Sequence, residues 1–396
     1  MLKEATLTRT DPGGVYGGFS ALEIVAGTPF GCSAPAPAPR AALSPRATLD
    51  SILRPALASP PCVIAFSGGR DSSALLAVAV DLARREGWQL PVALTLHFAG
   101  AATRETEWQE TVVGHLKLDD WIHLQIDEEL DLLGPIASRG MLRHGLMYPA
   151  NAHVVVPMAR HAVGGHLLTG VGGDDVFGNW PWHDLGSVIA GRARARARDT
   201  RRVLHLVAPA SLRGEIKRRR EPLGLPWIVA PARRQVARML AIELAGAPRT
   251  WSARMLWSAR WRPWRETARS MEVLTRDEGA TLGSPFLEPS FLASLAAAGG
   301  RCGWGDRTAT MHALFGDLLP EPVIHRRSKA EFSEPLFGNA TKRFAAAWNG
   351  DAGPVSDLVR PQVLRDLWQA RQPHGMSAMV LQAAWIASQD ASSHAA

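Results

Sequence analysis

The sequence is short of cysteine, and its three cysteines, Cys32, Cys62 and Cys302, are far apart and odd in number. That distribution is atypical of a disulfide framework or a cysteine-rich metal cluster, and it predicts reduced thiols. No apolar run reaches the roughly 18 residues that a membrane-spanning helix needs, and the N-terminus lacks the apolar core of a signal peptide. We therefore expect a cytoplasmic protein that does not cross a membrane.

Lysine is scarce too: of the 44 lysines and arginines only five are lysine, so arginine carries almost all of the positive charge behind the net +7. The positive charge is spread over most of the chain, which favours a compositional bias of the gene over one binding surface. An acidic partner or nucleic acid is the alternative interpretation. A chain of 396 residues, 46% of them hydrophobic, can hold a large core and is expected to form two domains.

Also missing is the common phosphate loop G-x-x-x-x-G-K-[ST]. A different glycine-rich segment, Ser67 to Ser73 (SGGRDSS), follows an apolar run over residues 62–66 that predicts a buried strand. The run over 73–85 is rich in alanine and leucine and predicts a helix. A tight turn between a strand and a helix N-terminus is typical of an anion site, because backbone N–H groups and the helix dipole both favour negative charge.

The side chains of this segment suit a phosphate that carries a metal ion. Three serine hydroxyls can donate to phosphate oxygens, and two glycines let the backbone approach closely. Asp71 would be unfavourable beside an anion unless it holds a cation, so we infer Mg²⁺. The residues expected at the phosphate are Ser67, Gly68, Gly69, Ser72 and Ser73.

The order of apolar runs predicts the fold class. Residues 92–96, 121–126 and 166–169 predict three further strands, and 166–169 is the last recognisable one. Helices are expected over 103–116 and 154–163. Strands that alternate with helices predict an α/β fold with an open, mostly parallel sheet. Ligands of such sheets bind beyond the carboxyl ends of the strands, where the first glycine-rich segment lies.

A second glycine-rich segment, Thr169 to Gly178 (TGVGGDDVFG), lies at the end of the last expected strand. Three glycines followed by Asp174 and Asp175 suit a loop near a polyphosphate and a second contact to Mg²⁺. By itself such a run would equally predict a surface turn. Its position at a strand end of the same sheet favours a place in the site.

Composition divides the chain into three parts. Residues 1–50 have few order signals and include a proline- and alanine-rich linker. Residues 51–185 are the expected α/β domain, and residues 186–396 form a mainly helical region that would complete the site. Within that region the arginine-rich stretch 192–220 predicts a solvated helix, with a contact to an acidic peptide or RNA as the alternative.

Three tryptophans, Trp257, Trp261 and Trp264, are spaced as one face of a helix, provided that Pro263 does not end it. Core packing is the ordinary function of such a stripe. A hydrophobic substrate pocket is the alternative.

Two later segments carry candidate site residues. Residues 283–288 (GSPFLE) place an acid after a rigid apolar turn, and residues 319–335 contain Lys329. In a chain with few lysines, a lysine kept among arginines indicates that a compact point charge is needed. An ordinary surface cation is the alternative.

Together these segments resemble the asparagine synthetase family. S-G-G-x-D-S, a glycine-rich loop ending in acids, P-F-L-[DE] and R-x-K-x-x-F-x-x-P occur here in the order found in asparagine synthetases, β-lactam synthetases and lasso-peptide cyclases. The resemblance covers roughly residues 62–338. Four ordered motifs are more specific than one loop, and they argue against other enzymes that share the first loop. The fold implied is that of the adenine-nucleotide α-hydrolase-like ATP pyrophosphatases.

The resemblance implies an ATP-dependent carbon–nitrogen ligase that releases AMP and pyrophosphate. A carboxylate attacks the α-phosphate of ATP, and an amine then takes the acyl group from the adenylate. Asp71 and Asp174 would hold Mg²⁺, and Lys329 would stabilise charge in the transition state. The nucleotide-binding residues implied are Ser67, Gly68, Gly69, Asp71, Ser72, Ser73, Leu96, Gly170 and Gly172.

Two departures from the family pattern bear on the substrates. About sixty residues precede the first expected strand and Leu2 replaces the family's N-terminal cysteine, so glutamine hydrolysis is not expected. Many members carry an acid after the first glycine of the second loop, where this chain has Val171. A substituted amine in natural-product or peptide modification therefore fits better than asparagine synthesis, with Tyr148 or His153 as candidates for the missing base.

Two other functions stay open from the sequence alone. The chain could be a non-catalytic nucleotide-binding partner of another biosynthetic enzyme, in which case it would not release pyrophosphate. It could also be a nucleic-acid-directed ligase that uses the arginine-rich stretch, in which case RNA binding would depend steeply on salt. The expected partners are small-molecule or peptide carboxylate and amine substrates, with partner biosynthetic proteins as a further expectation.

Overall fold

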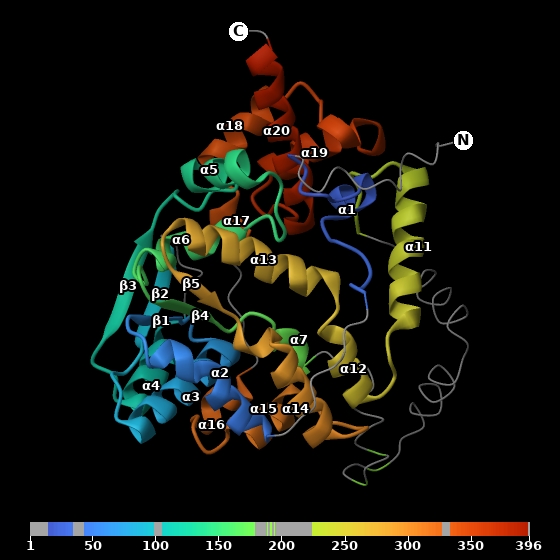
Figure 1. Ribbon diagram of the computed structural model, residues 1–396. Helices are drawn as coiled ribbons and strands as arrows, with labels where there is room; N and C mark the ends of the chain where they lie inside the picture. Colours follow the sequence, from blue (N-terminus) through green and yellow to red (C-terminus); the bar gives the residue numbers. More distant parts are fainter. Residues whose placement is uncertain are drawn as a thin grey trace.

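The structure, a computed structural model, describes residues 15–34, 43–98, 105–178, 188, 191, 194, 224–326 and 333–394. Its centre is a five-stranded sheet with the strand order β3-β2-β1-β4-β5 (Figure 1). Every neighbouring pair of strands is parallel, which confirms the predicted open parallel sheet. The strands are β1 (Cys62–Ala65), β2 (Val92–Phe98), β3 (Trp121–Ile126), β4 (His166–Thr169) and β5 (Thr281–Gly283).

The central strands are apolar on both sides because helices cover both faces of the sheet. Ile64 of β1 is in register with Ala93 of β2 and Leu168 of β4, and all three belong to one buried cluster. Their neighbours Val63 and Leu167 belong to the other cluster. Side chains thus alternate between two cores, as the period of a strand requires.

Different helices build the two cores (Figure 1). The first core lies between the sheet and α2 (Pro45–Leu57), α3 (Arg70–Glu86) and α4 (Thr106–Leu116). The second lies on the opposite face, under α6 (Val155–Ala159) and α13 (Arg262–Asp277). The other α-helices of the described residues are α1 (Ala21–Ala26), α5 (Pro135–His144), α7 (Gly173–Gly178), α11 (Ala230–Gly246), α12 (Trp251–Ser258), α14 (Pro289–Gly299), α15 (Arg307–Phe315), α16 (Glu321–His325), α17 (Ser333–Leu336), α18 (Asn339–Ala347), α19 (Pro361–Gln369) and α20 (Ala378–His394).

The sheet extends further than the sequence predicts. Residues 166–169 were expected to be the last strand, yet β5 pairs with β4 in parallel, with Leu282 opposite Leu167. A strand of three residues is too short to show an alternating pattern in the sequence. β5 forms because the chain leaving α13 returns along the edge of β4, and it thereby delivers the P-F-L-E segment to the sheet.

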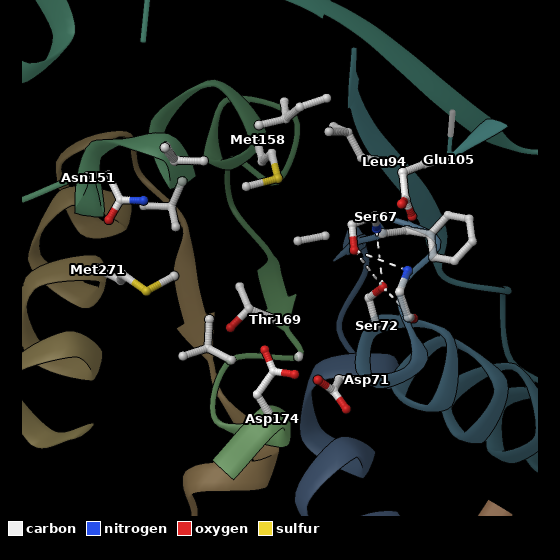
Figure 2. A pocket seen from close by; sticks show the side chains of 18 of the residues that line it. Ser67, Asp71, Ser72, Leu94, Glu105, Asn151, Met158, Thr169, Asp174 and Met271 are labelled. Carbon is white, nitrogen blue, oxygen red and sulfur yellow. Dashed lines mark hydrogen bonds between the residues drawn. The ribbon is translucent and has the colours of Figure 1, made fainter. Parts of the chain in front are cut away.

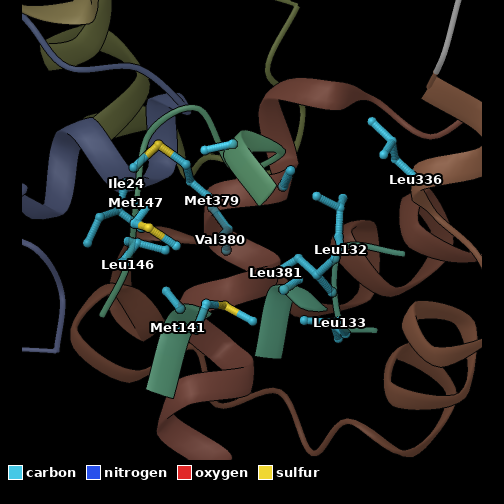
Figure 3. Close-up of a cluster of buried hydrophobic side chains, with 14 of the residues drawn as sticks. Ile24, Leu132, Leu133, Met141, Leu146, Met147, Leu336, Met379, Val380 and Leu381 are labelled. Carbon is cyan, nitrogen blue, oxygen red and sulfur yellow. The ribbon is translucent and has the colours of Figure 1, made fainter. Parts of the chain in front are cut away.

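The N-terminal segment is built into the helical part of the chain. α1 begins at a capping box in which Ser20 and Glu23 exchange hydrogen bonds. The indole of Trp227 donates to the carbonyl oxygen of Val25 at 2.9 Å. Figure 3 shows Ile24 of α1 in one buried cluster with residues that precede α6 and residues of α20.

The three tryptophans do not lie on one helix. α12 ends at Ser258, and Pro263 lies in the first turn of α13, where a proline is tolerated. The indoles nevertheless form a row, with ring centroids 6.1 Å apart between Trp257 and Trp261 and 5.8 Å apart between Trp261 and Trp264. The row connects α12 to α13, and its last member donates to Asp175 Oδ2 at 3.0 Å.

In the part of the chain that the structure describes, no helix is long and apolar enough to cross a membrane. Nearly all of the arginine-rich stretch 192–220 lies outside the described residues, and its expected role stays a prediction.

Candidate active site

The first glycine-rich segment forms a turn between β1 and α3, as predicted. α3 begins at Arg70, three residues earlier than expected, so Asp71 and Ser72 lie in its first turn. Gly68 has a φ of +79°, and a Cβ there would lie 2.7 Å from Cγ of Gln109. Only glycine adopts this conformation without strain. The turn leads directly into the N-terminus of α3, where an anion is favoured.

Two serines hold this turn in shape. The hydroxyl of Ser72 accepts from the backbone N–H of Ser67 at 3.2 Å and donates to the carbonyl of Gly69 at 3.1 Å. The hydroxyl of Ser67 lies 3.1 Å from that of Ser72 and accepts from the N–H of Gly69 at 3.3 Å. The loop is thus ordered by its own hydrogen bonds, which lowers the cost of organising it around a ligand.

The second glycine-rich loop packs directly against the first. A Cβ at Gly170 would lie 3.0 Å from the backbone nitrogen of Ser72, and a Cβ at Gly173 would lie 2.4 Å from Cγ of Asp71. Glycine at both positions lets the two loops touch. This contact places Asp174, in the first turn of α7, beside Asp71.

A cavity of about 670 Å³ opens at these loops, beyond the carboxyl ends of β1, β2 and β4 (Figure 2). Of the residues predicted from the sequence, seven line it: Ser67, Gly69, Asp71, Ser72, Leu96, Gly170 and Asp174. Gly68, Ser73 and Gly172 do not line it: Ser73 is fully buried, and a Cβ at Gly172 would clash with Leu287. Lys329 lies outside the described residues.

Arg307, at the start of α15, bridges the two carboxylates. Its Nη2 donates to both oxygens of Asp71, at 2.8 Å and 2.7 Å, and its Nη1 donates to Asp174 Oδ1. Burial raises the pKa of Asp71 and the nearby charge of Asp174 raises it further, whereas Arg307 lowers it. The sequence did not single out Arg307, because one arginine among many carries no signal until the fold brings it to the acids.

Arg326 is a second site residue that the sequence alone does not mark. Its Nη1 donates to the carbonyl oxygen of Gly68 at 2.7 Å, and its Nη2 pairs with Glu105. The guanidinium also lies 5.1 Å from the ring centroid of Trp108. Arg326 therefore fixes the end of α16 to the first loop, directly before the segment that carries Lys329.

Neither candidate for a general base lines the cavity. His153 is buried, with Nε2 3.0 Å from the carbonyl oxygen of Leu130, and burial lowers its pKa. Its position indicates a structural role. Burial raises the pKa of the Tyr148 phenol, and a hydrogen bond to Thr28 opposes that shift. Tyr148 thus faces the α1 side of the molecule.

The wall opposite the first loop is largely apolar, with Asn151 and Thr267 as its polar residues. Side chains from the region of α6, from α13 and from α17 form it, and Figure 2 shows Met158 and Met271 there, across the cavity from Ser67 and Asp71. The ionisable side chains at the cavity come from the loop side: Arg70, Asp71, Glu105, Asp174, Arg307, Arg326 and, at the end of β2, His97. The cavity thus has one charged end and one apolar end.

Comparison with known families identifies the family of this chain. A family model described as asparagine synthase matches residues 46–389, which is most of the chain. The chain belongs to the asparagine synthase family. Asparagine synthase family members are ATP-dependent enzymes of the ligase or amidotransferase type, and this protein is accordingly an enzyme of that kind. Among curated proteins, no match was found.

Asparagine synthase family enzymes use ATP, usually with Mg²⁺. Mg²⁺ is commonly held by one or two carboxylates, with substrate phosphates and water completing the shell. Asp71 and Asp174 supply two carboxylates that converge on one cation, the Arg307 guanidinium. Among the described residues no cluster of three or more His, Cys, Asp or Glu side chains could hold a metal. The donors fit a metal that arrives with a polyphosphate.

Proposed function

We propose that this asparagine synthase family member is an AMP-forming amide ligase. An oxygen of the substrate carboxylate attacks the α-phosphorus of ATP, the bond to the bridging oxygen breaks, and pyrophosphate leaves. An amine nitrogen then attacks the acyl carbon, loses a proton, and AMP leaves with the carboxylate oxygen. The observation that carries the proposal is the contact between the two glycine-rich loops, which brings Asp71 and Asp174 to the N-terminus of α3.

Three groups of residues have separate roles in this reaction. Backbone N–H groups of the first loop and the hydroxyl of Ser67 bind the leaving pyrophosphate, and Ser72 holds the loop in shape. Asp71 and Asp174 would hold Mg²⁺, which when bound would supply positive charge to neutralise the departing pyrophosphate. Lys329 follows Arg326 closely in the chain and stabilises charge on the reacting phosphate.

The apolar wall indicates the class of substrate. Besides ATP, the cavity must hold the group next to the reacting carboxylate or amine, and that group meets Val154, Val155, Met158, Val171, Met271 and Leu336. An ionised side chain would lose its hydration there without gaining an oppositely charged partner among the described residues. We infer a substrate with an uncharged, largely apolar group, as in natural-product or peptide modification of the β-lactam-synthetase or lasso-cyclase kind, rather than free aspartate.

The test of the ligase chemistry follows one oxygen atom. Candidate carboxylates labelled with ¹⁸O are incubated with ATP, Mg²⁺ and amines, and the products are examined by mass spectrometry. Transfer of one ¹⁸O into AMP, together with pyrophosphate, is the expected result. Release of ADP and phosphate would contradict adenylation. Binding of ATP without pyrophosphate from any substrate would favour a non-catalytic nucleotide-binding protein instead.

Placing a charge on the apolar wall should impair use of the carboxylate substrate selectively. Thr267 lines the cavity one turn before Met271 on α13 and is only partly buried. Thr267→Glu should raise the KM of that substrate by on the order of tenfold or more, because an unpaired carboxylate opposes apolar contact. The KM of ATP should change by less than about twofold.

Thr267→Val is the matched control, since it keeps the shape and adds no charge; its KM values should stay near those of the wild type. Steady-state kinetics with each substrate varied in turn distinguishes the cases. An unchanged carboxylate KM in Thr267→Glu would mean that the substrate does not occupy this wall.

A further inference from the structure

The Arg307 guanidinium lies where two carboxylates converge. It contacts three carboxylate oxygens, both of Asp71 and one of Asp174. Asp71 is well buried, so its charge depends on this partner more than an exposed acid would. Among the described residues Arg307 is the cation that pairs directly with both acids, and the charge of Arg70 adds to its effect on Asp71.

Arg307 and Mg²⁺ would compete for these oxygens. A metal ion bound by Asp71 and Asp174 would share oxygens that now accept hydrogen bonds from Arg307. Its two positive charges would repel a guanidinium held at the same place in a partly buried site. We therefore expect Arg307 to give up contacts to these oxygens when both carboxylates ligate a metal.

The surroundings of Arg307 offer it a second position. Its side chain lines the cavity beside the first loop, where a polyphosphate would lie. Its Nε is buried and makes no hydrogen bond to the described part of the chain, so one donor is unused in the present arrangement. The planar fork of arginine matches phosphate oxygens as well as it matches a carboxylate.

We propose that Arg307 is an exchangeable counter-cation of the ATP site, which pairs with Asp71 and Asp174 in the metal-free protein and moves to a phosphate oxygen of ATP when Mg²⁺ takes its place. The proposal rests on the proposed function for the identity of the ligands. It makes Arg307 a phosphate-binding residue as well as a positioning residue for the two acids. The alternative is a permanent ion pair that only joins α15 to the two loops.

The test uses calorimetry to measure the affinity of the protein for Mg²⁺ alone and for Mg²⁺ together with a nucleotide. Neither measurement involves turnover. The nucleotide is α,β-methylene-ATP, from which pyrophosphate cannot leave. Arg307→Met removes the charge and keeps the length of the side chain. Its affinity for Mg²⁺ alone should rise by about tenfold or more, because the competitor is gone. Its affinity for the magnesium nucleotide should fall by about tenfold or more, because a phosphate contact is lost.

Arg54→Met is the matched control. It also removes one positive charge from an arginine–carboxylate pair, with Glu86, but that pair is at the surface and does not line the cavity. Both affinities should stay within about twofold of the wild type. If Arg307→Met does not fold, Arg307→Lys is used. An ammonium group cannot make the bidentate contact of a guanidinium, so both affinities should change in the same directions by smaller factors.

The outcomes separate the two proposals. Opposite changes in the two affinities would support the exchange. Equal or reduced Mg²⁺ affinity in the variants, in a protein that transfers ¹⁸O to AMP, would overturn the exchange and leave the ligase function intact. A wild-type protein that binds no magnesium nucleotide would overturn both.

Discussion

Replacing Lys329 by alanine should lower the rate of pyrophosphate release by on the order of a hundredfold or more and leave ATP binding nearly intact. This is the scale of losing one preorganised donor that acts on charge developing in the transition state. The measurement pairs single-turnover kinetics with calorimetric affinity for a non-reacting ATP analogue. A loss of ATP affinity without a loss of rate would show that Lys329 binds the ground state as well as it binds the transition state.

The described neighbours of Lys329 support this role. Arg326, three positions before Lys329 in the sequence, is anchored to Gly68 and Glu105 at the cavity. Arg326→Gln should loosen the contact between the end of α16 and the first loop and reduce the rate as well, although Lys329 is unchanged.

Lys329→Arg should restore little of the activity, because a planar guanidinium cannot replace a compact ammonium in a closed site. Lys342→Ala is the control, since Lys342 is an exposed lysine on α18. It should behave like the wild type. If Lys329→Arg kept most of the wild-type rate, the proposed role of Lys329 would be wrong and Lys329 would be an ordinary surface cation.

Asp71→Asn should abolish turnover of magnesium ATP with little loss of stability. The amide keeps the shape of the carboxylate but is a poor ligand for Mg²⁺. Burial already raises the pKa of Asp71, so its ionised form is held at a cost in the folded protein. Removing the charge gives up the ion pair with Arg307 but also removes the repulsion from Asp174.

Thermal unfolding and pyrophosphate release are measured on the same preparation of the Asp71→Asn variant. Asp81→Asn serves as the control: this aspartate lies on the same helix and pairs with Arg85 at the surface. It should keep the wild-type rate. Wild-type pyrophosphate release in Asp71→Asn would refute the metal role of Asp71.

The parallel sheet and both glycine-rich loops could be predicted from the sequence because their signals are local. A buried strand, a glycine turn and a helix start lie within a few neighbouring residues, as in the segment from Cys62 to Glu86. The order of strands along the chain then places both loops at one edge of the sheet.

Arg307 and Arg326 could not be predicted, because their function depends on distant partners. Arg307 is 236 positions from Asp71, and Arg326 is 258 positions from Gly68. Nothing in the sequence near either arginine marks it among so many others. The same holds for β5, whose three residues become a strand only because β4 offers an edge.

The close contact of Gly170 and Gly173 with the first loop has a consequence for protein engineering. These two positions set the separation of the two acids, and a side chain at either would push them apart. The apolar wall comes from other elements, chiefly α6 and α13. Substitutions on those helices should therefore change substrate preference without altering the spacing of the two acids.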